Sequence, residues 1–251
     1  STDNFMSYQQ FNSIITDNND NILITTPTKM FVFDVNGKLL FNLETASTFE
    51  FGKLSKTQSG DIIAHEKGYI TDSEVSRLSI IDVANKCYSK TYETTTPMLT
   101  IANGYDEFDI IYSNTTSLMG YNLEQNTSET IINLLDTGFD SLAMNHQIVL
   151  PNGKIVCVRN EYVLYGTGFS YDPTKTKLSI LTKLDPSEVP DKKLITLAGL
   201  YIDTNLQHRI LEFNRTNLEY KVQIKIYSDE YGNNEAITKL NNDIITGNIP
   251  D

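Results

Sequence analysis

Phe51 to Ala64, FGKLSKTQSGDIIA, is the clearest sign of the fold because it places a short polar turn between two apolar runs. Phe51 to Thr57 is the first run, Gln58-Ser59-Gly60 is the turn, and Asp61 to Ala64 is the second run. Glycine next to a small polar residue is typical of hairpin turns, and β-branched and aromatic residues favour strands. The stretch therefore predicts two antiparallel strands.

The same order of runs and turns occurs four times, in residues 11–43, 51–92, 98–134 and 147–182. The second run of each copy begins near residue 21, 61, 108 or 154, which gives a repeat of about 40 to 47 residues. Repeated four-stranded antiparallel units of this length are typical of propeller blades. The sequence predicts a mainly β chain with a β-propeller-like repeat of about four four-stranded antiparallel blades, followed by a short α/β segment.

Ring closure is a separate question, because propellers usually close with four to eight blades. Four copies are the lower end of this range, and the fourth copy has no obvious last strand. Three explanations are open. The first, which we favour, is that further blades precede Ser1. The second is that the units form an open array, and the third is that a partner chain covers the exposed ends.

A change of pattern near residue 190 predicts a domain boundary, since Asp185 to Asp191 contains two prolines and four polar residues. We expect a propeller-like domain in residues 1–190 and an incomplete α/β domain in residues 191–251. The expected elements of the second part alternate: strands at 194–197 and 220–227, helices after Asp203 and at 235–246. This order predicts a right-handed parallel unit.

The charge of the chain excludes several classes of partner. It has 32 acidic and 20 basic residues, a formal charge of −12 and a pI near 4.7. Such a surface repels the phosphate backbone of nucleic acids and anionic membranes. The sequence has no run of eighteen apolar residues, and Ser1 to Asn4 lacks the basic start of a signal peptide, so we expect neither a spanning helix nor a leader.

Cys87 and Cys157 both lie in strand-like runs. Free cysteine packs as a small hydrophobic side chain, so we expect two buried, unpaired thiols in preference to a disulfide. Asp17 to Asn21 has the composition of a calcium loop but lacks its glycine and terminal glutamate, and a hairpin turn explains it better.

The three histidines, His65, His146 and His208, lie in different segments without a carboxylate at ligand or triad spacing. We therefore expect ordinary surface histidines, with no metal, no cofactor and no catalytic residues. The chain is predicted not to be an enzyme.

The end of the chain resembles a known family. Four segments carry the resemblance, of which the last is the most specific: residues 197–201, 210–214, 220–224 and the string LNNDIITGNIPD at 240–251. They resemble the start of extracellular solute-binding proteins of the family-one, maltose-binding type, especially Firmicutes lipoproteins with a propeller ahead of the binding domain. The resemblance implies capture of a sugar or peptide for the permease of an ABC importer, and a place on the cell surface through an anchor outside this chain. It also implies that the chain is a fragment, since the second lobe is absent.

Two groups of residues are candidate ligand contacts. The resemblance implies that the loop Gly199 to Asp203 borders the ligand, with Tyr201 as a stacking residue and Asp203 beside it. The alternative is that Tyr201 is simply an aromatic residue at an interface. Independently, the insertion at residues 159–176 is an aromatic-rich loop that could form a recognition patch or a packed lid. Its candidate residues are Tyr162, Tyr165 and Phe169.

We therefore predict a non-catalytic extracellular binding module of a solute-binding lipoprotein. One alternative is a propeller scaffold that binds a protein partner, as repeat architectures without catalytic residues do. Another is a propeller lyase or glycosidase, which would need carboxylates and histidine in the central channel.

Overall fold

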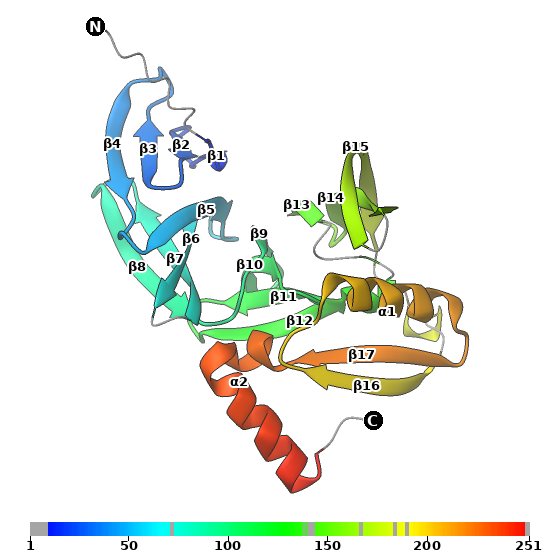
Figure 1. Cartoon of the computed structure of the whole chain (residues 1–251). Coiled ribbons are helices and arrows are strands. Elements are labelled where there is room, and N and C mark those ends of the chain that lie inside the picture. The colour runs from blue at the N-terminus through cyan, green and yellow to red at the C-terminus, as the bar shows by residue number, and fades with distance from the viewer. Residues whose placement is uncertain are drawn as a thin grey trace, which may run out of the picture.

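In the computed structural model, four antiparallel sheets form an arc, and a small α/β segment lies beside it (Figure 1). The structure describes residues 10–70, 73–137, 139, 144–165, 168–182, 185–188 and 191–248. The predicted fold class is confirmed: the chain is mainly β, with a propeller-like repeat of antiparallel blades and two helices in the described part.

The blades follow the four sequence repeats, and within each blade neighbouring strands are consecutive in the chain. Blade A contains β1 (Ser13–Thr16), β2 (Ile22–Thr25), β3 (Lys29–Phe33) and β4 (Leu39–Glu44). Blade B contains β5 (Phe49–Lys56), β6 (Ile62–Ile70), β7 (Ser73–Asp82) and β8 (Cys87–Thr94). Blade C contains β9 (Thr100–Tyr105), β10 (Phe108–Ser113), β11 (Ser117–Asn122) and β12 (Thr127–Asn133). Blade D has three strands, β13 (Met144–Val149), β14 (Ile155–Tyr165) and β15 (Gly168–Leu181).

Side-chain hydrogen bonds close the hairpin turns. The Asp17 carboxylate accepts from the backbone N–H groups of Asn19 (2.8 Å) and Asn21 (2.9 Å), so this segment is the hairpin turn that the sequence predicts. In blade B the Thr57 hydroxyl accepts from the Asp61 N–H at 3.0 Å, and Gly60 has a φ of 91°, which glycine adopts without strain. Each turn thus fixes the register of the two strands that it joins.

The hydrophobic cores lie between the blades. Leu23 and Val32 of blade A pack against Ile62 of blade B, and Ile63 of blade B packs against Ile110 of blade C. The interior blades B and C therefore bury both faces, which explains why five consecutive residues at the start of β6 are buried. The fourth strands β8 and β12 lie outermost and are mostly exposed.

The first strands β1, β5, β9 and β13 lie next to one another along the inside of the arc. Polar side chains join them, because the Leu54 N–H of β5 donates to the Ser13 hydroxyl (3.0 Å) and the Lys56 N–H donates to the Asn103 amide oxygen (3.0 Å). Side chains from both neighbouring blades thus satisfy backbone groups of β5.

The α/β segment contains β16 (Lys193–Gly199), α1 (Thr204–Thr216), β17 (Tyr220–Ile226) and α2 (Tyr227–Thr246), and its two strands are parallel, as predicted. The second helix begins eight residues before the predicted Glu235. The added residues are largely polar and do not show helical periodicity. Tyr227 is buried and its hydroxyl donates to Asp243, which ties the first turn of α2 to its last part.

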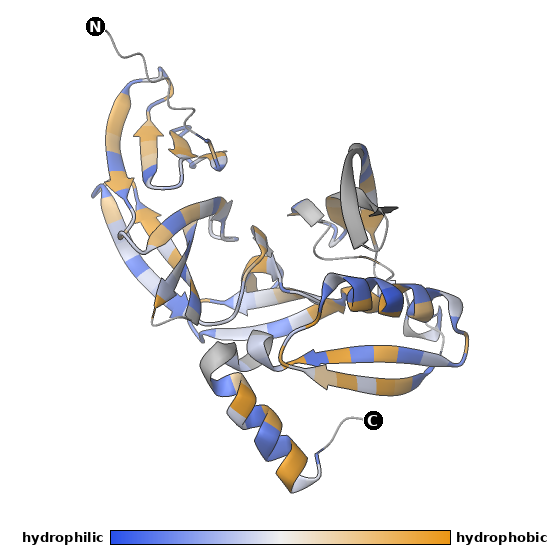
Figure 2. Ribbon diagram, in the orientation of Figure 1, coloured by the Kyte–Doolittle hydropathy of each residue, from blue (hydrophilic) through white to orange (hydrophobic). Residues whose placement is uncertain are grey.

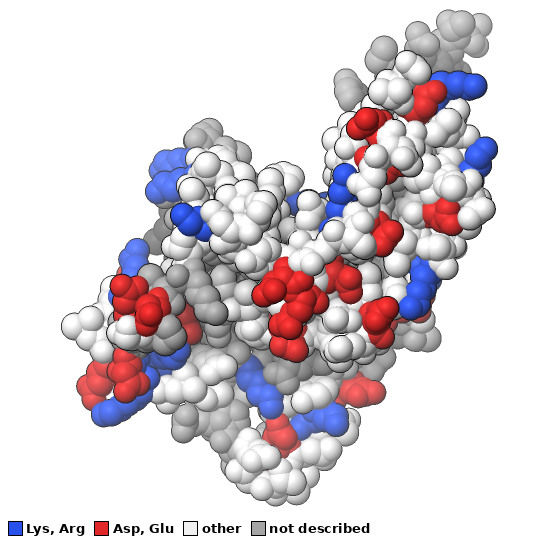
Figure 3. All heavy atoms as spheres, turned by 180° about the vertical axis from the view of Figure 1, so that it is seen from behind, with Lys and Arg blue, Asp and Glu red and all other residues white. Residues whose placement is uncertain are grey.

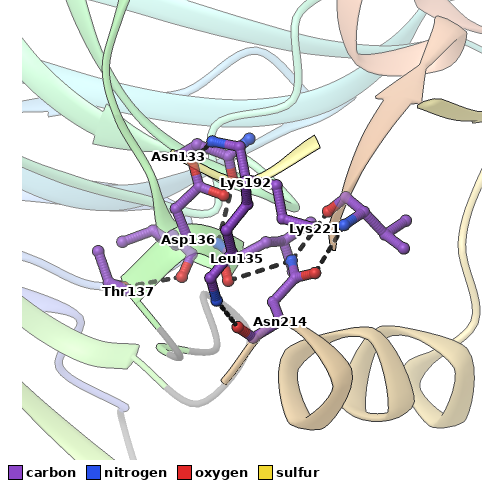
Figure 4. A network of polar contacts seen from close by, with 9 residues as sticks. Asn133, Leu135, Asp136, Thr137, Lys192, Asn214 and Lys221 are labelled. Carbon is purple, nitrogen blue, oxygen red and sulfur yellow. Dashed lines mark hydrogen bonds and ion pairs between the residues drawn. The ribbon is translucent and has the colours of Figure 1, made fainter. Parts of the chain in front are cut away.

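A network around Asn214 joins this segment to blade C (Figure 4). The Asn214 amide donates to the Val222 carbonyl (2.8 Å) and accepts from the Val222 N–H (2.6 Å), and it also reaches the Leu135 carbonyl at 3.5 Å. Leu135 belongs to the short helix η1 (Leu134–Thr137) after blade C and is buried against Ile210 and Ile224. An ion pair between Lys221 and Asp136 (2.9 Å) lies beside them. The segment therefore packs directly on the propeller-like arc.

The two cysteines are both free, but only one is buried. Cys157 lies in the core between blades C and D, and its burial raises the pKa of the thiol to about 11. The prediction was wrong for Cys87, which is exposed because β8 is the outermost strand of blade B.

Candidate functional site

In the predicted ligand loop, Tyr201 and Asp203 have different surroundings. Tyr201 is 81% exposed, and Asp203 is the N-cap of α1, where its carboxylate accepts from the N–H groups of Asn205 (3.0 Å) and Leu206 (3.1 Å). An N-cap of this kind stabilises the helix by about 1 kcal/mol. The local geometry gives Asp203 a structural role, and ligand binding by these two residues stays a prediction.

The aromatic insertion of blade D is part of a long hairpin. Tyr162 and Tyr165 lie on β14, and Phe169 lies on β15, with Tyr162 opposite Tyr171 and Tyr165 opposite Gly168. The expected loop is therefore wrong, since both strands continue through most of the insertion. The side chains of these aromatic residues lie outside the described part of the structure, and their role in recognition remains a prediction.

Blade D has an apolar face that no other blade covers, which we call the D face. Its rows run across the sheet: Ile148 is opposite Val156, Val156 is opposite Ile180, and Val158 is opposite Leu178. Leu178 is 69% exposed and Ile180 is 58% exposed. The other face of blade D packs against blade C, where Ile155 and Cys157 are buried.

Blade A has a similar uncovered face at the other end of the arc, which we call the A face. Ile14 pairs with Ile24, Ile24 pairs with Phe31, and the Phe31 and Phe33 rings stack with centroids 6.4 Å apart. Ile14 is 69% exposed. Figures 1 and 2 show blade A at one end of the arc, with hydrophobic residues along β3 and β4, and blade D at the other end.

Inside the arc, the residues that correspond to the D face are buried. The cross-strand pair Val158–Leu178 of blade D corresponds to the pair His65–Leu78 of blade B, and Val156–Ile180 corresponds to Ile63–Ile80. Leu78 and Ile63 are fully buried because blade C covers them. The A face and the D face are thus sheet surfaces of the kind that this fold buries elsewhere.

A cavity of about 280 Å³, the inner-strand cavity, lies where blades A, B and C meet; it is lined by Asn12, Gly52, Lys53, His65, Lys67 and Thr100, among others. His65 is 2% exposed, and burial lowers its pKa to about 3, with Lys67 and Lys53 adding to the effect. The prediction of surface histidines was therefore wrong for His65. His146, which is exposed, lies with its Nδ1 atom 3.1 Å from the Lys53 Nζ atom.

The sequence alone did not point to this group of basic residues. The strand alternation could have placed His65 and Lys67 on the face that Ile63 shares, but the approach of residues 53 and 146 depends on three-dimensional packing. Two larger cavities are lined by polar, mostly uncharged residues: one at the inner turns of blades B to D (about 670 Å³) and one between blade C and the β17–α2 region (about 610 Å³).

Two features are absent from the described residues. They contain no group of three or more His, Cys, Asp or Glu side chains that could hold a metal ion. Within the same part of the chain, no helix is long and apolar enough to cross a membrane.

Comparison with known proteins gives structural similarity only. No family model and no curated protein matches the sequence. A protein of unknown function from Bacteroides caccae is similar at 11% identity and a TM-score of 0.45, over 79% of this chain and 69% of that one. The Pan2 WD40 domain of Neurospora crassa is similar at 12% identity and a TM-score of 0.44, over 68% and 48%. Virginiamycin B lyase from Staphylococcus aureus is similar at 11% identity and a TM-score of 0.37, over 72% and 73%. The chain thus spans about half the length of the Pan2 domain.

The predicted membership of the maltose-binding type of solute-binding protein is wrong. The similar solved structures include a WD40 domain and a lyase. The string at 240–251 carried the resemblance. Its described residues lie in α2 and in the turn that follows, at the end of a segment that packs on blade C. A role in sugar or peptide capture for an ABC importer has no support from these findings.

Proposed function

We propose that this chain is a non-catalytic interaction scaffold that binds a protein partner through the A face and the D face. The observation that carries the proposal is the contrast between Leu78 and Leu178, which occupy the same position in their blades. Leu78 is fully buried, whereas Leu178 is 69% exposed. Contiguous exposed apolar surface marks protein interaction sites.

The internal cores indicate the kind of surface that a partner would present. Within the arc, apolar side chains from one blade pack on aliphatic and aromatic side chains of the next. Removal of apolar surface from water is favourable by about 25 cal/mol per Å², before the costs of association are subtracted. A partner with a flat sheet face of aliphatic residues fits the A face and the D face best.

The lining of the inner-strand cavity favours binding over catalysis. A lyase or glycosidase of the predicted kind needs carboxylates together with histidine on the axis, as general acids and bases. The side chains that line this cavity in the described part include lysine and histidine but no Asp or Glu. This composition supports a scaffold.

Site-specific photo-crosslinking tests the proposal. A photoreactive amino acid replaces Leu178 in the D face, and the matched control replaces Leu218, which is apolar and 87% exposed but lies in the turn before β17. We expect a defined protein adduct in the source cells from position 178, lost when Ile180 is changed to Glu, and no such adduct from position 218. Equal adducts from both positions, or none from position 178, would overturn the proposal.

A further inference from the structure

Basic side chains converge at the inner-strand cavity. Lys53 comes from β5, His65 and Lys67 come from β6, and His146 comes from β13, so three strands contribute to what we call the inner basic cluster. The chain as a whole carries a formal charge of −12, and on the face drawn in Figure 3 acidic side chains gather near the middle. The cluster is therefore a local reversal of the overall charge.

A β-bulge brings Lys53 to the cavity. In the β5–β6 ladder Phe51 is opposite Glu66 and Leu54 is opposite Ala64, so Gly52 and Lys53 together face His65. A bulge of this kind bends the strand and redirects a side chain. Residue 52 lies close to the imidazole: a Cβ atom there would be 3.1 Å from the His65 Nδ1 atom, so a larger residue would require a shift of a few tenths of an ångström.

The β6 side of the cavity is fixed by the strand alternation. Ile63, His65 and Lys67 share the face toward blade C, and the Lys67 ammonium donates to the Leu99 carbonyl at 3.2 Å. The His65 Nε2 atom lies 3.4 Å from the Ser76 hydroxyl, which holds the ring in place. Two lysines and an imidazole thus line one small cavity.

The basic groups of the cluster repel one another. Burial lowers the pKa of Lys53, and the charge of Lys67 lowers it further. Burial also lowers the pKa of His146, with Lys53 as the second cause. The carboxylate of Glu74 on β7 acts in the opposite direction on Lys67. Like charges held together in a partly desolvated site cost free energy, which a bound anion would offset.

We propose that the inner-strand cavity binds a small oxyanion, a carboxylate or a phosphate group, through the ammonium groups of Lys53 and Lys67, with His65 in its wall. Ammonium groups bind both kinds of oxyanion through short charge-assisted hydrogen bonds. The volume of about 280 Å³ lies at the lower end for small-molecule sites, so the ligand is small. This site is separate from the A and D faces and does not depend on a protein partner.

Calorimetric titration of the full chain tests the site, with inorganic phosphate and succinate as separate probes at low ionic strength. Each of Lys53→Met and Lys67→Met keeps much of the side-chain stem and removes the charge. The control is Lys38→Met, which makes the same change in an exposed turn of blade A. We expect saturable binding of phosphate, succinate or both, weakened about tenfold or more by either cavity substitution and unchanged by the control.

The probes and the variants decide the outcome together. Binding of phosphate alone assigns a phosphate group, and binding of succinate alone assigns a carboxylate. The absence of binding to both probes overturns the proposal, as does binding that Lys53→Met and Lys67→Met leave intact. Because a misfolded variant would also lose binding, Gly52→Ala provides a second test: it keeps both lysines, narrows the cavity next to His65, and should weaken binding while thermal unfolding remains cooperative.

Discussion

Leu78 and Leu178 occupy the same position in the third strands of blades B and D, yet Leu78 is fully buried and Leu178 is 69% exposed. Their sequence surroundings are also alike, Leu-Ser-Ile-Ile at 78–81 and Leu-Ser-Ile-Leu at 178–181. The difference arises because blade C covers Leu78, whereas blade D is the last blade of the arc. Burial at these positions therefore depends on the place of the blade and not on the local sequence.

This contrast predicts different costs for the same substitution. Leu78→Ala should lower the free energy of unfolding by about 2 to 5 kcal/mol, because it leaves a cavity in the core between blades B and C. Leu178→Ala should change it by about 0.5 kcal/mol or less, as exposed substitutions do. Urea unfolding of the two variants measures both values. Equal losses would mean that the D face is covered in solution.

Removal of the Asn214 side chain should loosen the α/β segment. Asn214→Ala leaves the Val222 N–H and carbonyl of β17 without their side-chain partner, and a buried unpaired polar group costs about 1 to 3 kcal/mol. Hydrogen exchange should show faster exchange of the Val222 amide, with the amides of β6 unchanged. Asn242→Ala, at an exposed position on α2, is the control and should have no such effect. Uniformly faster exchange in all blades would contradict a local role.

The burial of His65 predicts a loss of stability in acid. Its pKa is lowered to about 3 in the folded chain, against about 6.5 in the unfolded chain. The unfolded state therefore binds the extra proton first, and the free energy of unfolding falls as the pH is lowered from about 6.5 toward 3. Each unit of pKa difference corresponds to about 1.4 kcal/mol.

His65→Gln should remove this part of the decrease in the free energy of unfolding at low pH, because glutamine does not titrate. Chemical unfolding between pH 7 and pH 4 measures the slope for the two chains. The positive charges of Lys53 and Lys67, which also disfavour the imidazolium, do not change over this range in either chain. If both chains lose stability equally, His65 is not the group responsible.

The repeat predicts the blades well, since each strand of blade B and its turns can be read from runs such as Asp61 to Ala64. The α/β segment could be read in the same way, apart from the early start of α2. What the sequence does not contain is the relation between distant segments. The approach of Lys53 to His146 depends on a bulge in β5 and on the packing of β9 and β13, and neither has a local pattern.

The same limit explains why the sequence did not indicate the inner-strand cavity. Tyr201 was chosen because aromatic residues often stack on ligands; it is 81% exposed, and ligand binding there remains a prediction. His65 was not chosen because no carboxylate lies at ligand or triad spacing from it in the sequence, whereas its burial beside Lys67 comes from the face that β6 turns toward blade C. Burial decides the chemistry of such groups, and burial is a property of the packed blades.

Glu66, the neighbour of His65 on β6, predicts a pH effect of the opposite sign. Its side chain is buried on the face toward blade A, and its Oε2 atom has no hydrogen-bond partner in the described part of the structure. Burial raises the pKa of Glu66, while the Arg77 guanidinium, 4.0 Å away, acts against the rise. In the folded chain Glu66 therefore stays protonated up to a higher pH than in the unfolded chain. The free energy of unfolding should fall as the pH rises above about 4.5 through the raised pKa.

Glu66→Gln removes this titration and should raise the free energy of unfolding at pH 7 by about 1 kcal/mol, since an amide costs less to bury than a carboxylate. Urea unfolding from pH 4.5 to pH 8 measures the effect. Glu235→Gln makes the same charge change at an exposed position of α2 and should leave the profile unchanged. A Glu66→Gln variant less stable than the parent at every pH would instead show that the ion pair with Arg77 outweighs the cost of burying the Glu66 carboxylate.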